Sequence, residues 1–316
     1  MISVQRILCP IDFSDFSRHA LDHAVAMARW YGAEVVVLYV LPPVELPLPM
    51  PDLLMAPAAV ATPDDLKEIE DAVERFVRTE VGDEVVTVAV RAGTVVDEIV
   101  CLAKEWLADL IVMGTHGRTG FERFLVGSVT ARVLRNAPCP VVTVPKRMAD
   151  AVSTGTPFRR ILCGVDFSPS SMQALTIAAA LAEEADATLT VVHVIEHQIF
   201  EPTAMPGLDS PREIARRDSA LQQIRAALPR DVSTYADVHE LVLTGKAYRE
   251  ILRHADDMRA DLIVLGAGGG LVDAAFGSTA DHVVKEAACP VLTVKPSGQL
   301  LRGTADNSAR QHAHSS

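Results

Sequence analysis

The feature that most restricts the fold of this chain is an internal repeat. The second copy lies 154 residues after the first at the start of the repeat and 150 residues after it near the end. The recurring blocks are RILC (residues 6–9 and 160–163), DFS (residues 12–14 and 166–168) and DLIV (residues 109–112 and 261–264). A period this long indicates two whole domains rather than a solenoid. The sequence therefore predicts a first domain at residues 1–148, a linker at 149–157, a second domain at 158–296 and a disordered polar tail at 297–316.

Short apolar segments alternate with amphipathic segments in each half. In the first half we expect strands at residues 6–11, 34–41, 85–90, 110–113 and 141–144, and helices at residues 15–31, 64–80, 95–107 and 129–135. The strand segments are continuously apolar, which is typical of a parallel sheet covered by helices on both faces. Ser14 and Ser168 are expected to cap the first helix of each half. The sequence predicts two tandem doubly wound, Rossmann-like α/β domains, each with a five-stranded parallel sheet.

A loop with three glycines joins the predicted strand 110–113 to the predicted helix 129–135. Gly114, Gly117 and Gly127 lie in it, and Ser128 precedes the helix. Glycine allows close approach and positive φ, and the free N–H groups at a helix start point toward an anion. The spacing is neither that of a P-loop nor the Rossmann fingerprint, and glycines often mark ordinary turns. Because strand, loop and helix start occur together, we favour phosphate binding. Nearby positive or proton-donating groups are His116, Arg118 and Arg123.

Asp12 follows the first predicted strand, and Gly114 follows the fourth. Doubly wound sheets bind ligands beyond the carboxyl ends of their strands, so we expect these two residues to lie together. Asp12 recurs as Asp166. This recurrence fits a ligand-binding carboxylate and a turn or capping residue equally well.

Composition excludes several classes of function. A net charge of −12 argues against non-specific nucleic-acid binding. No apolar stretch has the length of a membrane span, and the chain begins with a predicted strand rather than a signal peptide, so we expect no membrane contact and a cytoplasmic location. No C-x-x-C pair occurs, so the cysteines are expected to be buried structural thiols and no metal site is predicted. They are Cys9, Cys101, Cys139, Cys163 and Cys289.

The last predicted strands of the halves, residues 141–144 and 291–294, are apolar and follow Pro140 and Pro290. A final strand commonly lies at a sheet edge, where unpaired N–H and C=O groups bind another strand. We expect the two to pair, so that the halves form an intramolecular pseudo-twofold dimer. A homodimer then needs another surface, for which the proline-rich residues 41–62 are the candidate. The alternative for that segment is a long crossover on its own domain.

On the repeat and the glycine loop, the chain resembles the universal stress protein family in its tandem two-domain form, over residues 6–295. The family's nucleotide signature is glycine, two residues, glycine, nine residues, glycine, then serine or threonine, and the first half matches it from Gly114 to Ser128. The resemblance implies ATP as ligand, with or without Mg²⁺. It places Asp12 and the backbone of Val40 at the adenine and ribose end. The phosphates are held by the N–H groups of Gly117, Ser128 and Val129 and by the Ser128 hydroxyl. The implied site comprises Asp12, Val40, Met113, Gly114, His116, Gly117, Arg118, Gly127, Ser128, Val129 and Thr130.

The second half departs from the signature. Only seven residues separate Gly269 from Gly277, and the loop between residues 267 and 276 has no basic residue or histidine. It contains Asp273, whose charge would repel a triphosphate. We interpret this half as degenerate: either structural, or binding something less charged than ATP.

The resemblance implies an ATP-binding stress protein whose nucleotide state regulates assembly or the choice of a regulatory protein partner. One alternative is a slow ATPase or nucleotidyl transferase. This enzymatic alternative lacks a recognisable nucleophile–base set, because Asp12, His116 and Asp97 are the only candidates near the glycine loop. Asp97 is better explained as a capping-box partner of Thr94. Another is a nucleotide-free dimerisation module, against which the intact signature argues.

Overall fold

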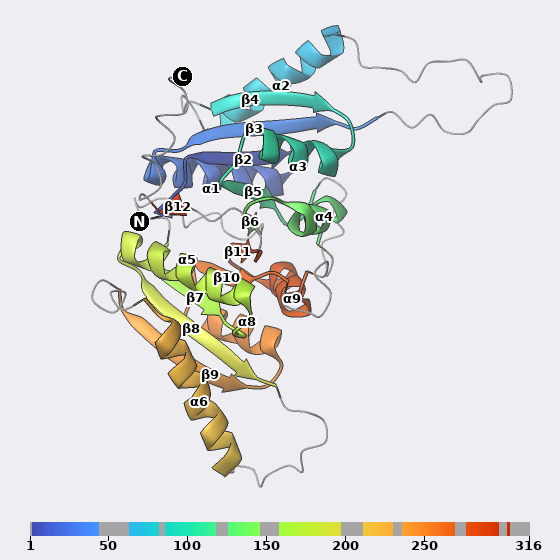
Figure 1. Ribbon diagram of the computed structural model, residues 1–316. Coiled ribbons are helices and arrows are strands. Elements are labelled where there is room, and N and C mark those ends of the chain that lie inside the picture. The colour runs from blue at the N-terminus through green and yellow to red at the C-terminus, as the bar shows by residue number, and fades with distance from the viewer. Residues whose placement is uncertain are drawn as a thin grey trace, which may run out of the picture.

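Strands and helices alternate along both halves of the chain (Figure 1). The computed structural model describes residues 2–43, 63–81, 86–117, 126–145, 158–196, 211–229, 236–268, 276–296 and 302–303. The first half forms β2 (Arg6–Ile11), α1 (Asp15–Tyr31), β3 (Glu34–Leu41), α2 (Pro63–Val81), β4 (Val86–Ala92), α3 (Val95–Glu105), β5 (Leu110–Gly114), α4 (Ser128–Asn136) and β6 (Val141–Val144). The second half forms β7 (Arg160–Gly164), α5 (Pro169–Ala185), β8 (Thr188–Ile195), α6 (Pro211–Ala227), β9 (Val238–Thr244), α8 (Ala247–Asp257), β10 (Leu262–Gly266), α9 (Ser278–Glu286) and β11 (Val291–Val294).

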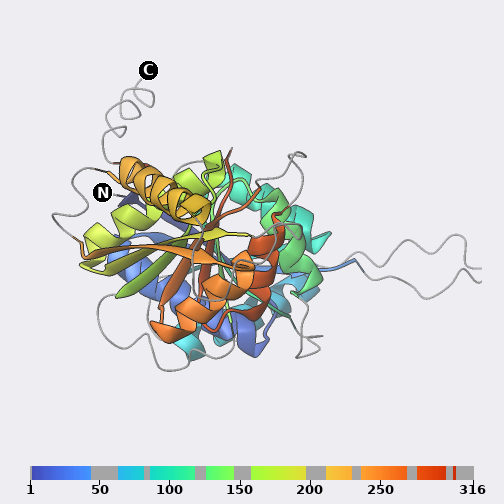
Figure 2. The ribbon, with the colours of Figure 1, turned by 90° about the horizontal axis from the view of Figure 1, so that it is seen from below.

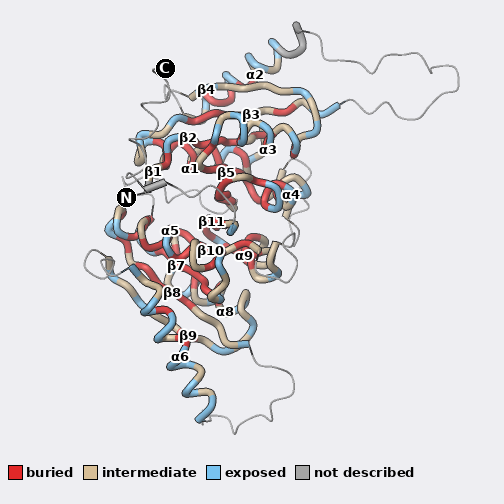
Figure 3. The backbone as a smooth tube through the Cα atoms, in the orientation of Figure 1, coloured by how far each residue is buried: buried red, intermediate tan, exposed pale blue. Residues whose placement is uncertain are grey.

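The strands of both halves join in one ten-stranded sheet with the order β4-β3-β2-β5-β6-β11-β10-β7-β8-β9. Paired strands are parallel within each half. One buried cluster draws on α1, α2, α5 and α6, and a second on α3, α4, α8 and α9. Figure 2 shows α6 and α8 on opposite sides of the strands, and Figure 3 shows burial concentrated along the central strands. The predicted fold, with a five-stranded parallel sheet in each half, is confirmed.

The antiparallel pairing of β6 with β11 joins the two halves, which lie one above the other in Figure 1. Val141 lies opposite Thr293, and Thr143 opposite Val291. The buried Thr143 hydroxyl donates to the Val291 carbonyl at 3.3 Å, and the buried Thr293 hydroxyl donates to the Val141 carbonyl at 3.2 Å. The predicted pairing through the last strands is therefore confirmed.

A second contact crosses the join between α1 and α5. The Tyr31 hydroxyl at the end of α1 is hydrogen-bonded to the Glu184 carboxylate near the end of α5. Burial, and then the charge of Glu184, raise the pKa of Tyr31 well above its usual value. The two first helices therefore fix the halves against each other on one face of the shared sheet.

Local signals explain where several helices begin. Ser14 Oγ accepts from Ser17 N at 3.2 Å, and Ser168 Oγ accepts from Ser171 N at 3.3 Å, so both predicted caps are confirmed. Thr94 is the N-cap of α3, but its side chain makes no capping hydrogen bond, so the capping-box interpretation of Asp97 is wrong. Glu98 is the first-turn carboxylate that turns back toward the preceding strand, where it forms an ion pair with Arg91 at 3.5 Å.

One short pairing contradicts part of the predicted disordered tail. Strand β12 (Arg302–Gly303) pairs antiparallel with β1 (Ile2–Ser3). The remaining tail, the linker at residues 149–157, residues 44–62 of the proline-rich segment and the loop from 197 to 210 lie outside the described residues. The domain boundaries therefore stay predictions.

Four of the five cysteines are buried, as predicted, and burial raises the pKa of each of these thiols, to about 12 for Cys139 and Cys289. Cys101 is the exception because it lies exposed on α3, where its Sγ donates to Glu105 Oε1 at 3.0 Å. Among the described residues, no group of three or more His, Cys, Asp or Glu side chains could hold a metal ion. None of the described helices is both long and apolar enough to cross a membrane.

His23 is a buried polar exception on α1. Only 7% of it is exposed, and among the described residues its Nε2 has no hydrogen-bond partner. Burial, and then the nearby charge of His19, lower the pKa of His23 to about 4. The repeat places Ile177 at the corresponding position of α5.

We therefore predict that His23→Ile removes a pH-dependent loss of stability. Because the folded-state pKa lies below the unfolded value of 6.5, the unfolded chain alone takes up a proton as the pH falls from 6.5 toward 4. At pH 5 this costs the wild type about 2 kcal/mol of unfolding free energy relative to pH 7. Urea denaturation at both pH values measures it. An equal effect of the substitution at pH 7 and pH 5 contradicts the prediction.

Candidate functional site

The site begins where β2 and β5 stop pairing. β2 pairs with β3 over all six of its residues, but with β5 only at Ile7 and Leu8. Pro10 follows this short pairing, and proline has no N–H to offer a neighbouring strand. Chain order reverses between β2 and β5, which is where doubly wound sheets place their ligands.

Asp12 lies at the end of β2 and meets the glycine loop. Its Oδ1 accepts from Ser14 N at 3.1 Å and from Ser14 Oγ at 2.6 Å, so the carboxylate does hold the turn before α1. Gly117 approaches the same carboxylate so closely that a Cβ added to it would lie 2.5 Å from Asp12 Oδ2. The structure thus brings the first strand end and the loop together, as the topology predicts.

The residue between Asp12 and Ser14 holds a strained backbone conformation. Phe13 has a φ of 63°, in the left-handed region that residues other than glycine rarely adopt. The centroid of its ring lies 5.0 Å from that of the Tyr39 ring and 5.3 Å from that of the Phe76 ring. Packing on β3 and α2 therefore compensates for a turn that fixes the direction of the Asp12 carboxylate.

The first two glycines of the signature serve close packing. A Cβ at Gly114 would lie 2.7 Å from the Phe16 Cβ, so the end of β5 can touch the first turn of α1 only without a side chain. Neither Gly114, Gly117 nor Gly127 has a positive φ; Gly127 has a φ of −51°. The expectation that these glycines supply positive φ is wrong; Gly114 and Gly117 are required instead because a Cβ at either position would clash.

Two hydrogen bonds hold the start of α4 beside the end of β5, and a third joins the residue after β5 to β6. Gly127 N donates to Thr115 O at 2.9 Å, and Thr115 N donates to Val144 O at 3.1 Å. The buried Thr130 hydroxyl donates to Gly114 O at 2.9 Å. Because the N-cap is glycine, it has no side chain to accept from the N–H groups of Ser128 and Val129, and the first turn of a helix offers them no acceptor. The arrangement leaves a donor-rich helix end next to Asp12 and Gly117.

His116 adds a further polar group to the loop. Its Nδ1 lies 3.0 Å from Thr115 Oγ1, and its ring lies 5.0 Å from the ring of Phe16. Its Nε2 is buried and has no hydrogen-bond partner among the described residues. A buried polar atom without a partner costs about 1–3 kcal/mol, so this nitrogen favours a hydrogen-bonding ligand. Arg118 and Arg123 lie outside the described residues.

The remaining implied site residues are apolar. Val40 on β3 and Met113 on β5 are 6% and 5% exposed and belong to the same buried cluster. They give the sheet end an apolar wall on the face covered by α3 and α4. The structure places the described members of the implied site at the ends of β2, β3 and β5, in residues 116–117 of the loop and at the start of α4.

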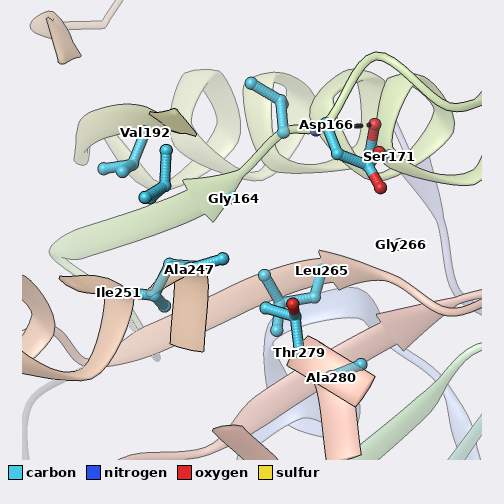
Figure 4. A pocket seen from close by; sticks show the side chains of 12 residues that line it. Gly164, Asp166, Ser171, Val192, Ala247, Ile251, Leu265, Gly266, Thr279 and Ala280 are labelled. Atoms are coloured by element: carbon cyan, nitrogen blue, oxygen red, sulfur yellow. Dashed lines mark hydrogen bonds between the residues drawn. The ribbon is translucent and has the colours of Figure 1, made fainter. Parts of the chain in front are cut away.

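The second half has a feature that the sequence analysis missed. A cavity of about 80 Å³ lies at the matching position, between the ends of β7 and β10 and the starts of α8 and α9 (Figure 4). The sequence signal that could have indicated this cavity is the small size of two side chains. Gly164 and Ala247 line the cavity, and they stand where the first repeat has Pro10 and Val95.

The universal stress protein family model matches residues 3–145 and again residues 157–295. The chain belongs to the universal stress protein family. A universal stress protein of Methanocaldococcus jannaschii is 39% identical over 149 residues, covering 45% of this chain and 82% of that protein.

Solved structures of universal stress proteins share the fold. One from Archaeoglobus fulgidus matches 92% of this chain and 98% of its own, with a TM-score of 0.65 and 22% identity. Another, from Pseudomonas aeruginosa, matches 93% of this chain and 94% of its own, with a TM-score of 0.62 and 19% identity.

Close packing of the loop glycines predicts a matched pair of stability effects. Gly266→Ser should lower the free energy of unfolding by about 1–3 kcal/mol, because the overpacked side chain must displace backbone. Its Cβ would lie 2.4 Å from Ser171 N. Gly277→Ser should leave the free energy of unfolding unchanged, since no atom of the described residues lies within 4 Å of a Cβ there and serine is a favoured N-cap. Urea denaturation compares the two, and equal losses would contradict the packing argument.

Proposed function

We propose that the first half binds ATP at the ends of β2 and β5, and that the nucleotide state regulates assembly or partner choice in the cytoplasm. The observation that supports this most is the complete glycine signature, whose last glycine caps α4 and leaves its first turn rich in free donors. Family membership supports the same ligand class.

Each site residue has a role in this proposal. Val40 and Met113 form the apolar wall for adenine, and Asp12 accepts hydrogen bonds from the ribose hydroxyls. The first-turn N–H groups of α4 and the Ser128 hydroxyl bind the phosphates, where the helix start favours negative charge. The Nε2 of His116 then gains the hydrogen-bonding partner that it lacks among the described residues.

Mg²⁺ accompanies the phosphates in this proposal. Proteins usually hold Mg²⁺ through phosphate oxygens and water with one or two carboxylates, so no dedicated cluster of acidic residues is required. Asp12 is the carboxylate nearest the loop among the residues described here, and its Oδ1 is already engaged by Ser14.

We propose a binding role rather than rapid hydrolysis. A general base must lie within hydrogen-bond reach of the attacking water and be free to take its proton. Asp12 Oδ1 accepts two hydrogen bonds from Ser14, so this oxygen is occupied in holding the turn before α1. Nucleotide retention, with negligible turnover, is the expected behaviour.

Calorimetric titration of the full chain with ATP tests the proposal, with one site per chain expected. Gly127→Val should weaken binding at least tenfold, about 1.4 kcal/mol, because its β-branched side chain enters the gap between the start of α4 and residues 115–117 of the loop. The fold should tolerate the change, since a Cβ at Gly127 makes only ordinary contacts at 3.4 Å with His116 and Thr115.

Gly277→Val is the matched control. Gly277 caps α9 with φ −50° and ψ 141°, against φ −51° and ψ 140° at Gly127, so the cost of losing the glycine cap is the same. ATP affinity should be unchanged in this variant. Two equivalent ATP sites in the wild type, or equal losses in the two variants, would refute the proposal.

A further inference from the structure

A lysine of the second half reaches the far end of the helix that begins at the proposed ATP site. Lys295 directly follows β11, and its Nζ donates to the carbonyl oxygens of Arg135 and of Ala137, the latter at 3.4 Å. Arg135 lies in the last turn of α4, and Ala137 is the C-cap. The last carbonyls of a helix have no partner within it, so a donor from elsewhere satisfies them. The two halves are therefore connected at α4 as well as along the sheet.

The central strand pairing fixes where this lysine lies. β11 and β6 run antiparallel with Thr293 opposite Val141, and the same register continued by two residues brings Lys295 opposite Cys139. Cys139 stands between the end of α4 and the start of β6. Burial, and then the charge of Asp109, raise the pKa of Cys139, and the nearby charge of Lys295 opposes them. The join thus places a cation at the C-terminal end of α4.

The first half lacks this group at the matching position. Pro145 follows β6 as Lys295 follows β11, and the register brings Pro145 opposite Cys289, just after α9. Proline has no amine, and its nitrogen has no hydrogen to donate. Figure 1 shows α4 and α9 on the same side of the join. Of these two related helices, the one with the complete glycine signature is the one that receives a lysine from the other half.

The charges within the two helices differ in the same sense. α4 has no acidic residue in its first turn, where Ala131 stands at the position of Asp281 in α9. Asp281 forms an ion pair with Lys285 of the same helix. A carboxylate near the N-terminus and a cation near the C-terminus both stabilise a helix through its dipole. Because α4 has only the cations at its C-terminal end, its N-terminal end is left to an anion from outside the helix.

α4 is short enough for a contact at one end to affect the other. Its nine residues span about 14 Å at 1.5 Å per residue. The hydrogen bond from the Thr130 hydroxyl to Gly114 O holds the first turn, and the amine of Lys295 holds the last. Loss of the second contact should let the helix shift against the glycine loop. Such a shift would misplace the first-turn N–H groups.

We propose that Lys295 is a positioning residue of the proposed ATP site, through which the second half raises the affinity of the first half for phosphates. Lys295 touches no ligand in this proposal, because it acts on the opposite end of α4. The proposal rests on the proposed function, since it concerns the same helix start. By linkage, ATP bound at α4 strengthens the contact with Lys295 by the same factor, so that nucleotide binding acts on the join between the halves.

Calorimetric titration of full-chain variants with ATP tests this role. Lys295→Met keeps the apolar stem and removes the amine, and it should weaken ATP binding about three- to fivefold, the usual effect of one cation at a helix end. Lys295→Arg should restore the affinity, because a guanidinium also donates to carbonyl oxygens. Lys285→Met is the matched control. It removes a cation from the last turn of α9 and should leave ATP affinity unchanged.

Amide hydrogen exchange without nucleotide separates this proposal from the proposed function. Lys295→Met should speed exchange in peptides from α4 but not in those from α9 or the central strands, which also checks that the variant is folded. If the wild type binds no ATP, the proposed function fails, while faster exchange confined to α4 still supports the positioning role of Lys295.

Four results would overturn the proposal. They are ATP affinity in Lys295→Met equal to that of the wild type, no recovery of affinity in Lys295→Arg, an equal loss in Lys285→Met, and unchanged exchange of α4 in Lys295→Met.

Discussion

The pairing of β6 with β11 is the constraint on which the rest of the structure depends. Each strand would otherwise be the edge of a five-stranded sheet, with a row of unpaired N–H and C=O groups. Their antiparallel register, reinforced by the reciprocal hydroxyl bonds of Thr143 and Thr293, satisfies both edges within one chain. Since β5 and β10 pair with these central strands, both glycine loops begin one strand away from the join. The tandem chain therefore builds as one molecule what two single-domain copies would build as a dimer.

Twofold symmetry of the scaffold makes the chemical asymmetry of the halves easy to see. Asp12 and Asp166 lie at equivalent strand ends, and each carboxylate accepts from the serine two residues later. The difference lies in what surrounds them. The first-half loop carries His116, whereas the second half has Gly268 at that position, and a cavity of about 80 Å³ lies at the second half's strand ends. Equivalent strand ends therefore carry different loops in the two halves.

Local signals made most of the fold predictable from sequence. The bounds of α1 follow from Ser14, which caps its start, and Gly32, which ends it with a φ of 65°. The central pairing was predictable because two apolar final strands cannot both remain exposed. The capping box predicted between Thr94 and Asp97 is absent, because a sequence pattern does not say which way a side chain turns. In the first turn of α3, Glu98 instead turns back and pairs with Arg91. The cavity depends on missing volume at Gly164 and Ala247, which matters only once four separate elements are packed together.

Native mass spectrometry of the freshly purified chain tests the central claim, that one half is built for a triphosphate and the other is not. The account predicts a complex with one ATP per chain, with the same stoichiometry when ATP is added in excess. Binding of two ATP molecules per chain, or of no adenine nucleotide at any ATP concentration, would contradict it.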